Sequence, residues 1–280
     1  MDSLVSTEWL AEHLGDPGLV ILDATKHLAA SGRDAGAEFL AAHIPGARFL
    51  NLGDFVDPAS SVGKTLPGPT HAAIRFSSLG IEPGSRVVIY DDSDVKTSAR
   101  AWFILRGYGI RSVAILDGGL AKWRAEERPL ERGKAKGAKS QFAAVDFGGA
   151  VRRKPDMLAN IASRAEQVID ARDAARFTGA ARDTVHNLPG GHIPGARHLF
   201  FRDLFTADGA FRSKAELRAA FAAAGVDLAC PIVTSCGSGV TASVLLFALH
   251  LIGVDGAALY DGSWAEWGAD PDTPKAIGPA

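Results

Sequence analysis

An internal repeat constrains the fold of this chain more than any other feature of its sequence. The hexapeptide His-Ile-Pro-Gly-Ala-Arg at residues 43–48 recurs without a change at residues 192–197, which is 149 positions later. The tripeptide Asp-Gly-Gly at residues 117–119 recurs as Asp-Gly-Ser at residues 261–263, which is 144 positions later. Matches in the same order and at nearly the same spacing indicate a tandem of two similar units, and not a short-period solenoid.

A stretch rich in small, polar and basic residues separates the two units. Residues 133–140 read Gly-Lys-Ala-Lys-Gly-Ala-Lys-Ser, a composition typical of a solvated linker. We therefore predict a first, non-catalytic domain over residues 1–130, a linker over residues 131–150 and a second, catalytic domain over residues 151–280. No aromatic residues are interleaved with the three lysines, which disfavours binding of single-stranded nucleic acid by the linker.

Short apolar segments alternate with helical patterns in both units. The predicted strands are residues 20–22, 86–90, 113–116, 168–169, 231–235 and 257–260. The predicted helices are residues 99–108, 120–126, 214–224 and 241–251. Strands that are apolar throughout are typical of parallel sheets covered on both faces. The sequence thus predicts an α/β fold with two tandem domains, each a mainly parallel sheet with helices on both faces.

The composition argues against a nucleic-acid or membrane partner. The chain has 30 Lys and Arg against 32 Asp and Glu, so it lacks the basic excess of a nucleic-acid-binding protein. Its apolar runs are shorter than the roughly 18 residues of a membrane span. Residues 1–14 carry three acidic residues and no Arg, unlike a signal or transit peptide. We expect a cytoplasmic protein that binds small molecules.

The strongest chemical signal lies in residues 236–241, here named the Cys236 loop. Cys236 directly follows a predicted strand and precedes a predicted helix, and sites in parallel sheets form at the carboxyl ends of strands. Gly237 and Gly239 let backbone N–H groups turn toward the sulfur, and the helix N-terminus adds a positive dipole end. Both effects favour a reactive thiolate. The alternative is an inert cysteine at a tight turn.

Two comparisons within the chain single out Cys236 as the nucleophile. At the 144-residue offset its place in the first unit is taken by Asp92, so only the second unit carries a thiol there. Cys230 stands before Pro231 without a glycine-rich loop, and we expect it to be structural. Two cysteines are too few for a disulfide framework or a cysteine-rich zinc site. We expect neither a metal nor an organic cofactor.

Cysteine loops of this shape serve two main chemistries. A cysteine phosphatase needs an Arg six residues after the cysteine to bind phosphoryl oxygens, and this chain has Ala242 there. The other chemistry is sulfur transfer, in which the sulfur becomes a persulfide anion surrounded by backbone amides. The residues of the loop favour sulfur transfer.

The sequence resembles the two-domain sulfurtransferases of the rhodanese superfamily over essentially its whole length. The resemblance rests on Cys-Gly-Ser-Gly-Val-Thr-Ala at residues 236–242, on both His-Ile-Pro-Gly motifs and on residues 260–267. It implies that the Cys236 thiolate takes a sulfur atom from a donor and passes it to cyanide or a thiol. A thioredoxin-like reductant is a candidate acceptor. The alternative without enzymatic turnover is a sulfur-carrier module.

The two residues after the cysteine bear on the donor. The thiosulfate-using branch of the family has cationic residues there, whereas Gly237 and Ser238 are uncharged. The chain is therefore most similar to the 3-mercaptopyruvate sulfurtransferase branch, whose donor is a monoanionic keto acid and whose product is pyruvate. Ser238 is expected to hydrogen-bond the donor or relay a proton, unless it merely fits the turn. A thiosulfate sulfurtransferase is the alternative enzyme.

The resemblance also implies how the donor is bound. Its carboxylate is expected on Arg176, because a guanidinium suits a carboxylate bidentately. The family's second carboxylate-binding Arg stands nine residues later, where this chain has Val185. Arg182 is expected to bind the donor in its place, with His186 and Lys64 as the alternatives. The family's Asp and His from the first domain fall on Gly53 and Lys64 here. The loop residues expected to bind the transferred sulfur are Gly237, Gly239, Val240 and Thr241.

Residues that recur in both units are expected to be structural. His43 and His192 lead into the repeated Ile-Pro-Gly turns, including the one in the unit that lacks the cysteine. Trp123 and Trp267 recur behind the Asp-Gly motifs and are expected in the two cores. Arg172 is expected to pair with a neighbouring Asp or to support the loop.

Overall fold

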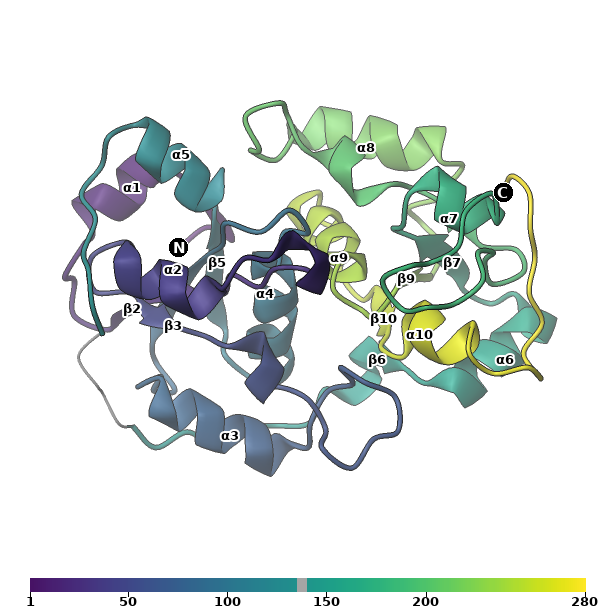
Figure 1. Cartoon of the computed structure of the whole chain (residues 1–280), viewed down its shortest axis with the longest axis horizontal. Helices are drawn as coiled ribbons and strands as arrows, with labels where there is room; N and C mark the ends of the chain where they lie inside the picture. The colour runs from purple at the N-terminus through teal and green to yellow at the C-terminus, as the bar shows by residue number, and fades with distance from the viewer. Residues whose placement is uncertain (135–139) are drawn as a thin grey trace. The chain divides into compact units, whose positions relative to one another are not determined.

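The computed structural model describes residues 1–134 and 140–280 of the chain. Residues 135–139, which belong to the predicted linker, lie outside the described residues. The chain forms two compact units, coloured from purple to yellow along the sequence in Figure 1. The first unit comprises Met1–Val56, Leu66–Asp146 and Ala207–Phe211, and the second comprises Asp57–Thr65, Phe147–Thr206 and Arg212–Ala280.

The first unit is built on a five-stranded sheet in the order β1-β5-β4-β2-β3, and every neighbouring pair of strands is parallel. The strands are β1 (Leu4–Val5), β2 (Leu19–Asp23), β3 (Arg48–Phe49), β4 (Arg86–Tyr90) and β5 (Ser112–Leu116). In the three central strands nearly every side chain is buried, which is the pattern of a sheet covered on both faces.

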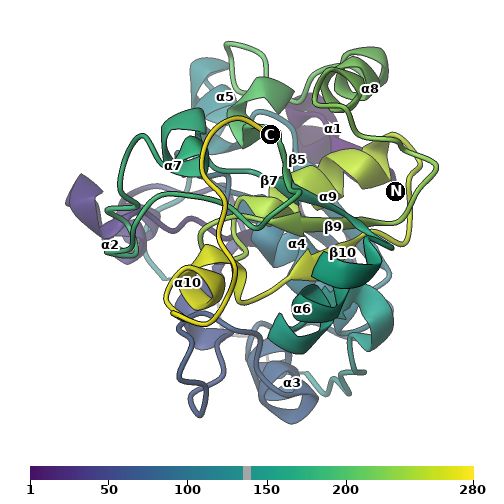
Figure 2. The same cartoon turned by 90° about the vertical axis from the view of Figure 1, so that its right-hand side faces the viewer.

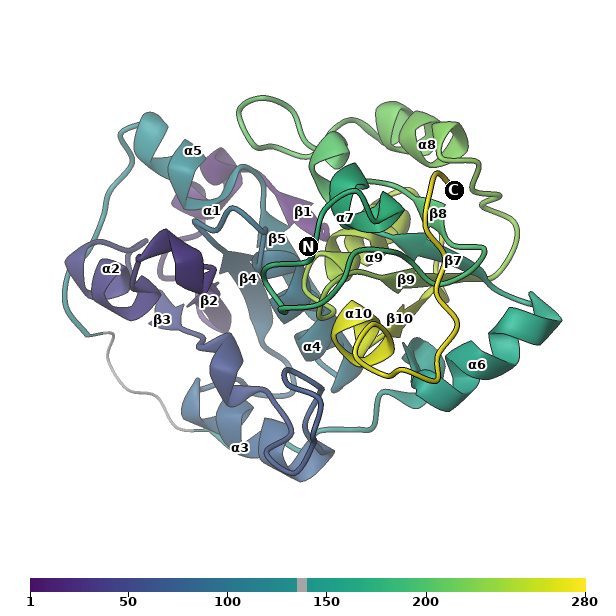
Figure 3. The ribbon, with the colours of Figure 1, turned by 45° about the vertical axis from the view of Figure 1, so that its right-hand side comes forward.

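Helices cover both faces of this sheet. The helices are α1 (Thr7–Glu12), α2 (Ala35–Ala41), α3 (Pro69–Ser78), α4 (Ser98–Gly107) and α5 (Gly119–Ala125), with short 3-10 turns at Ala29–Ser31 and Leu52–Asp54. Helix α4 packs on β4 and β5, on the opposite side of the sheet from α1 and α5 (Figure 3). Local signals place these helices: the Ser6 hydroxyl, for example, accepts the Trp9 N–H at the start of α1.

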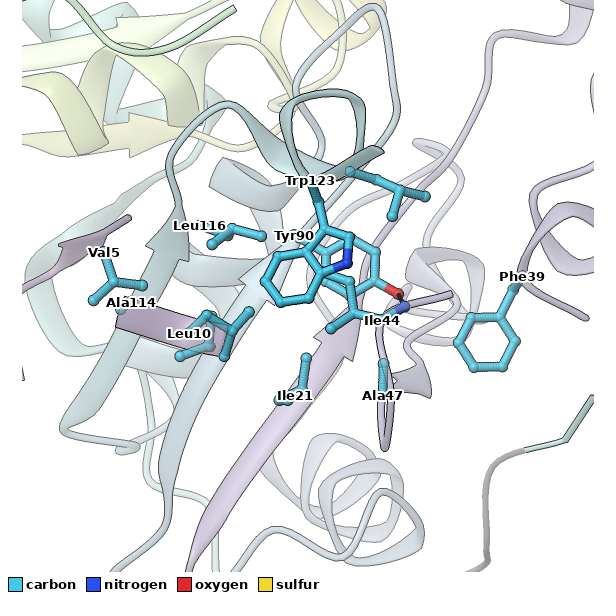
Figure 4. Packing of buried hydrophobic residues seen from close by; sticks show 12 residues of the cluster. Val5, Leu10, Ile21, Phe39, Ile44, Ala47, Tyr90, Ala114, Leu116 and Trp123 are labelled. Atoms are coloured by element: carbon cyan, nitrogen blue, oxygen red, sulfur yellow. Dashed lines mark hydrogen bonds between the residues drawn. The ribbon is translucent and has the colours of Figure 1, made fainter. Parts of the chain in front are cut away.

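Trp123 of α5 lies at the centre of the first unit's core. Its ring packs with Tyr90 at the end of β4, with Ile44 of the first His-Ile-Pro-Gly motif and with Leu10 of α1 (Figure 4). The Tyr90 hydroxyl accepts the Ile44 N–H at 3.3 Å. The repeated motif is thus tied to the sheet by the core itself.

The second unit repeats the architecture of the first, with a parallel sheet in the order β6-β10-β9-β7-β8. Its strands are β6 (Val151–Arg152), β7 (Gln167–Asp170), β8 (Arg197–His198), β9 (Ile232–Ser235) and β10 (Ala258–Tyr260). Its helices are α6 (Lys154–Ser163), α7 (Ala174–Thr178), α8 (Lys214–Ala223), α9 (Ala242–Leu251) and α10 (Ser263–Trp267), with 3-10 turns at Gly148–Ala150 and Phe201–Leu204. Helix α9 covers one face of β9 and β10, and α6 and α10 lie on the other (Figure 2).

The predicted fold class is confirmed, and so are all six predicted strands and four predicted helices, within one or two residues at their ends. The edge strands β1, β3, β6 and β8 were not predicted, because two residues are too short for a periodicity to register. Trp123 and Trp267 are fully buried in the two cores, as expected. None of the described helices has the length and apolar character needed to cross a membrane.

The two recurring histidines make the same contacts in both units. Nδ1 of His43 donates to the Phe39 carbonyl at 2.7 Å, and Nδ1 of His192 donates to the Phe177 carbonyl at 2.9 Å. Each imidazole stacks on the ring of its phenylalanine, with ring centroids about 4 Å apart. These contacts hold the turn that follows each histidine against a helix.

Candidate active site

Cys236 is the first residue after strand β9, at the carboxyl end of a central strand of the second sheet. Its side chain is almost completely buried, with 1% of its surface exposed. The start of α10 holds the backbone beside it: Trp264 N donates to Cys236 O at 2.9 Å, and Ala265 N donates to Gly237 O at 2.8 Å. The backbone at Cys236 is therefore held by two elements, the end of β9 and the first turn of α10.

Ser263 is a site residue that the sequence analysis missed. Its hydroxyl accepts the N–H groups of Cys236 and Gly239 at 3.2 and 3.1 Å and donates to the Tyr260 carbonyl at 2.8 Å. Its backbone lies in the left-handed region, with φ of 50°. The signal in the sequence was the one difference between the repeated motifs, Gly119 in the first unit against Ser263 in the second. Both residues have a positive φ, but only Ser263 has a hydroxyl to offer.

Removing the Ser263 hydroxyl should loosen the Cys236 loop. Ser263→Gly keeps the left-handed backbone at no steric cost but leaves two buried N–H groups without an acceptor, at a cost of about 1–3 kcal/mol each. We expect a lower Tm and a loss of kcat/KM of tenfold or more, measured by thermal unfolding and by a steady-state transfer assay. Ser263→Ala should be less stable still, because it adds the strain of a Cβ at positive φ. Wild-type activity in Ser263→Gly would contradict this role.

Four backbone N–H groups of the Cys236 loop have no acceptor among the described residues: those of Gly237, Ser238, Val240 and Thr241. Gly239, which was expected to offer its N–H group as well, donates it to Ser263 and contributes a left-handed turn with φ of 76°. Thr241 forms the N-cap of α9 and not its first residue, so its N–H group is also outside the helix. Unpaired N–H groups around a helix N-terminus form a site for an anion.

The equivalent loop of the first unit is filled by its own side chains. The Asp91 carboxylate accepts the N–H groups of Ser93 and Ser98, at 3.0 and 2.5 Å. Asp92, at the position of Cys236, is bound by the guanidinium groups of Arg33 and Arg124 at 2.9 and 3.3 Å. An internal carboxylate thus occupies the anion site that the second unit leaves open, and the first unit lacks a nucleophile.

Arg172 is a buried cation behind the Cys236 loop. Its guanidinium binds Asp170, with Nη2 2.6 Å from Oδ2, as expected, and stacks on the ring of Trp264 at 4.6 Å. Burial acts to lower the pKa of Arg172, but the charges of Asp170, Asp183 and the Cys236 sulfur raise it above its usual value. Arg172 is therefore a permanent positive charge that favours an anion at the sulfur.

Arg176, the expected carboxylate ligand, lies beside this group on α7. Its Nε donates to Asp173 at 2.6 Å, and its Nη1 lies 3.6 Å from Asp183. The Arg176 side chain is 22% exposed. Arg182 is more exposed, and its side chain makes no hydrogen bond or ion pair with the described residues; Val185 is also exposed.

His186 lies directly against the Cys236 loop. A Cβ built on Gly237 would come within 2.3 Å of His186 Cε1, so the imidazole occupies the place of a side chain beside the nucleophile. Its Nδ1 donates to the buried carboxylate of Asp183 at 3.0 Å. From the sequence, His186 was expected only as an alternative ligand for the donor's carboxylate, and its pairing with Asp183 was not predicted; the spacing Asp-x-x-His was the signal for the pair.

The remaining candidate residues differ in their surroundings. Ser238 is buried, and its hydroxyl makes no hydrogen bond to the described residues. Cys230 is exposed and donates to Asp227 at 3.4 Å; this hydrogen bond and the aspartate's charge raise the pKa of the thiol and disfavour its thiolate. Within the described ranges, no group of three or more His, Cys, Asp or Glu side chains is placed to hold a metal ion.

The fold and the site together define a tandem of parallel α/β domains in which one loop presents a cysteine to an open anion site. The family description "Rhodanese-like domain" matches residues 6–126 and again residues 154–270. The chain belongs to the rhodanese family, with one rhodanese-like domain in each half of its sequence. The resemblance inferred from the sequence is thus confirmed.

Individual relatives cover nearly the whole chain. It is 38% identical over 273 residues to the 3-mercaptopyruvate sulfurtransferase of Escherichia coli K12, covering 96% of both chains. It is 35% identical over 280 residues to the thiosulfate sulfurtransferase of Bos taurus, covering 97% of this chain and 94% of the relative. The crystal structure of SseA from Escherichia coli, described with the 3-mercaptopyruvate sulfotransferases, matches with a TM-score of 0.86 and 37% identity over 94% of this chain and 99% of that chain.

Proposed function

We propose that the chain is an enzyme that transfers sulfur from 3-mercaptopyruvate to a thiophilic acceptor through a persulfide on Cys236. The observation that carries the proposal is the buried Cys236 beside loop N–H groups that have no acceptor among the residues the structure describes. Uptake of sulfur leaves a persulfide anion, which preorganised amides and the positive end of α9 stabilise. Pyruvate leaves, and cyanide or a thiol removes the sulfur in a second step, so the cycle is ping-pong.

Charge at the site supports a keto acid as the donor. Gly237 and Ser238 add no cation beside the sulfur, whereas the partly exposed Arg176 carries a guanidinium that suits a single carboxylate. The free hydroxyl of Ser238 can donate to the bound donor. The Escherichia coli relative is named for 3-mercaptopyruvate and the bovine relative for thiosulfate, so thiosulfate is the second candidate donor.

The thiol chemistry also suggests a compartment and an acceptor. Cys230 and Cys236 are both free thiols, which suits a reducing compartment, and we place the protein in the cytoplasm. A thioredoxin-like reductant has the low-pKa thiolate that can attack the outer sulfur of a persulfide. The formal net charge of −2 favours neither nucleic acid nor an anionic membrane as a partner.

Steady-state kinetics with two donors test this function. We expect a higher kcat/KM for 3-mercaptopyruvate than for thiosulfate when cyanide is the acceptor. Ser238→Lys should shift the ratio toward thiosulfate by roughly tenfold or more, because a charge-assisted hydrogen bond contributes about 1.5–3 kcal/mol. Position 237 cannot serve for this change, since any side chain there meets His186.

Ser238→Met is the matched control, because it adds length without charge and should not favour thiosulfate. A wild-type enzyme that is faster on thiosulfate would contradict the proposed donor. A sulfur-carrier module would instead turn over poorly with either donor and small acceptors, and would require a protein partner for turnover.

A further inference from the structure

Asp183 and His186 form a carboxylate–imidazole pair that the function proposed above leaves without a role. His186 Nδ1 donates to Asp183 Oδ2 at 3.0 Å, and the backbone N–H of His186 donates to Oδ1 at 3.3 Å. Burial acts to raise the pKa of Asp183, but the hydrogen bond from His186 and the charges of Arg176 and Arg172 hold it below its usual value. The carboxylate is therefore ionised at neutral pH and keeps the proton of the imidazole on Nδ1.

The other ring nitrogen of His186, Nε2, is not used by the pair with Asp183. His186 Nε2 is buried and has no hydrogen-bond partner among the described residues. It would lie 3.2 Å from a Cβ on Gly237, the residue next to the nucleophile. An ionised Asp that fixes one nitrogen of a histidine and leaves the other without a partner is the arrangement by which enzymes hold a histidine for proton transfer.

We propose that His186 is the proton-transfer residue of the step that loads Cys236, with Asp183 as the positioning residue that fixes its tautomer. The inference rests on the proposed function. Asp183 is the charged group that contacts the imidazole, and the guanidinium groups of Arg172 and Arg176 lie 3.9 and 3.6 Å from the same carboxylate. Gly237 of the Cys236 loop lies against the ring.

The proton that His186 moves follows from the balance of the reaction. The Cys236 thiolate forms a bond to the donor's sulfur, the donor's carbon–sulfur bond breaks, and its electron pair stays on carbon as the enolate of pyruvate. The proton of the donor's thiol passes to His186 Nε2 and from there to that carbon, which becomes the methyl group of pyruvate. The persulfide anion remains on Cys236, and no external oxidant or reductant is consumed.

Thiosulfate provides an internal comparison, because its transferable sulfur carries no proton and its leaving group, sulfite, needs none.

His186→Asn keeps an amide N–H for Asp183 and removes the nitrogen that exchanges the proton. General acid–base groups contribute about 10²–10⁴-fold, so we expect kcat with 3-mercaptopyruvate to fall at least 100-fold. The rate with thiosulfate should stay within about threefold of wild type. The inhibition constant of pyruvate should stay within about twofold, because pyruvate carries the same carboxylate and needs no proton transfer.

His250→Asn is the matched control. His250 Nδ1 contacts Asp255 at the same 3.0 Å, but at the end of α9 away from the Cys236 loop, and its loss should change neither donor's kinetics. Equal losses with both donors in His186→Asn would mean that His186 only supports the loop. A raised inhibition constant for pyruvate with unchanged kcat would mean that it binds the carboxylate. Either outcome would overturn the proton-transfer role of His186, and an inactive Cys236→Ser would leave the proposed function standing. Sulfur transfer by Cys236→Ser would instead overturn the proposed function itself.

Discussion

Cys236→Ser is expected to abolish sulfur transfer and leave the fold intact. An alcohol cannot hold the sulfane sulfur, so turnover with either donor should fall below detection. The serine hydroxyl is close in size to the thiol, and the unpaired loop N–H groups can donate to it, so the Tm should stay near that of wild type. Mass spectrometry after incubation with donor alone should show one added sulfur atom on wild type and none on Cys236→Ser.

Cys230→Ser is the control for this prediction, because it removes the other cysteine of the chain. Cys230 lies six residues before Cys236, and its thiol is exposed. The hydrogen bond to Asp227 and the charge of that carboxylate raise the pKa of the Cys230 thiol and so disfavour its thiolate. We expect most of the wild-type activity and an unchanged persulfide on Cys236. A folded but inactive Cys230→Ser together with an active Cys236→Ser would show that the nucleophile is misassigned.

Arg176→Ala should cause a donor-specific loss. Removing a charge-assisted hydrogen bond costs about 1.5–3 kcal/mol, so kcat/KM for 3-mercaptopyruvate should fall by roughly 10–150-fold. Thiosulfate has no carboxylate and should lose less. Arg176→Lys should recover only part of the activity, since an ammonium cannot form the bidentate fork. The inhibition constant of pyruvate should rise, which separates this role from the one assigned to His186.

The comparison variant is Arg182→Ala, on the same stretch of chain; the Arg182 side chain is exposed and makes no hydrogen bond or ion pair with the described residues. We expect a much smaller loss there than in Arg176→Ala. Equal losses for both donors in Arg176→Ala would indicate that its contacts with Asp173 and Asp183 support the loop, and that the carboxylate is bound elsewhere.

Local sequence patterns were sufficient to predict the architecture and to single out Cys236 as the candidate nucleophile. The repeated His-Ile-Pro-Gly-Ala-Arg segment predicted two units of one design, and the two sheets have the same strand order. Strands such as residues 86–90 and 113–116 are recognisable because a strand covered on both faces carries a nearly continuous run of apolar residues. Cys236 was recognisable because a loop between a strand and a helix is continuous in sequence, so its glycines and its cysteine are read together.

The sequence by itself thus determined the tandem α/β fold, the rhodanese family and the loop that carries Cys236. Only the tertiary structure decided which side chains surround that loop. Ser263 reaches it from the turn after β10, and His186 reaches it from the segment after α7, 50 residues before the nucleophile in the sequence. No periodicity or spacing links these two residues to the Cys236 loop, because they meet it only when parallel strands bring their carboxyl ends to one edge of the sheet.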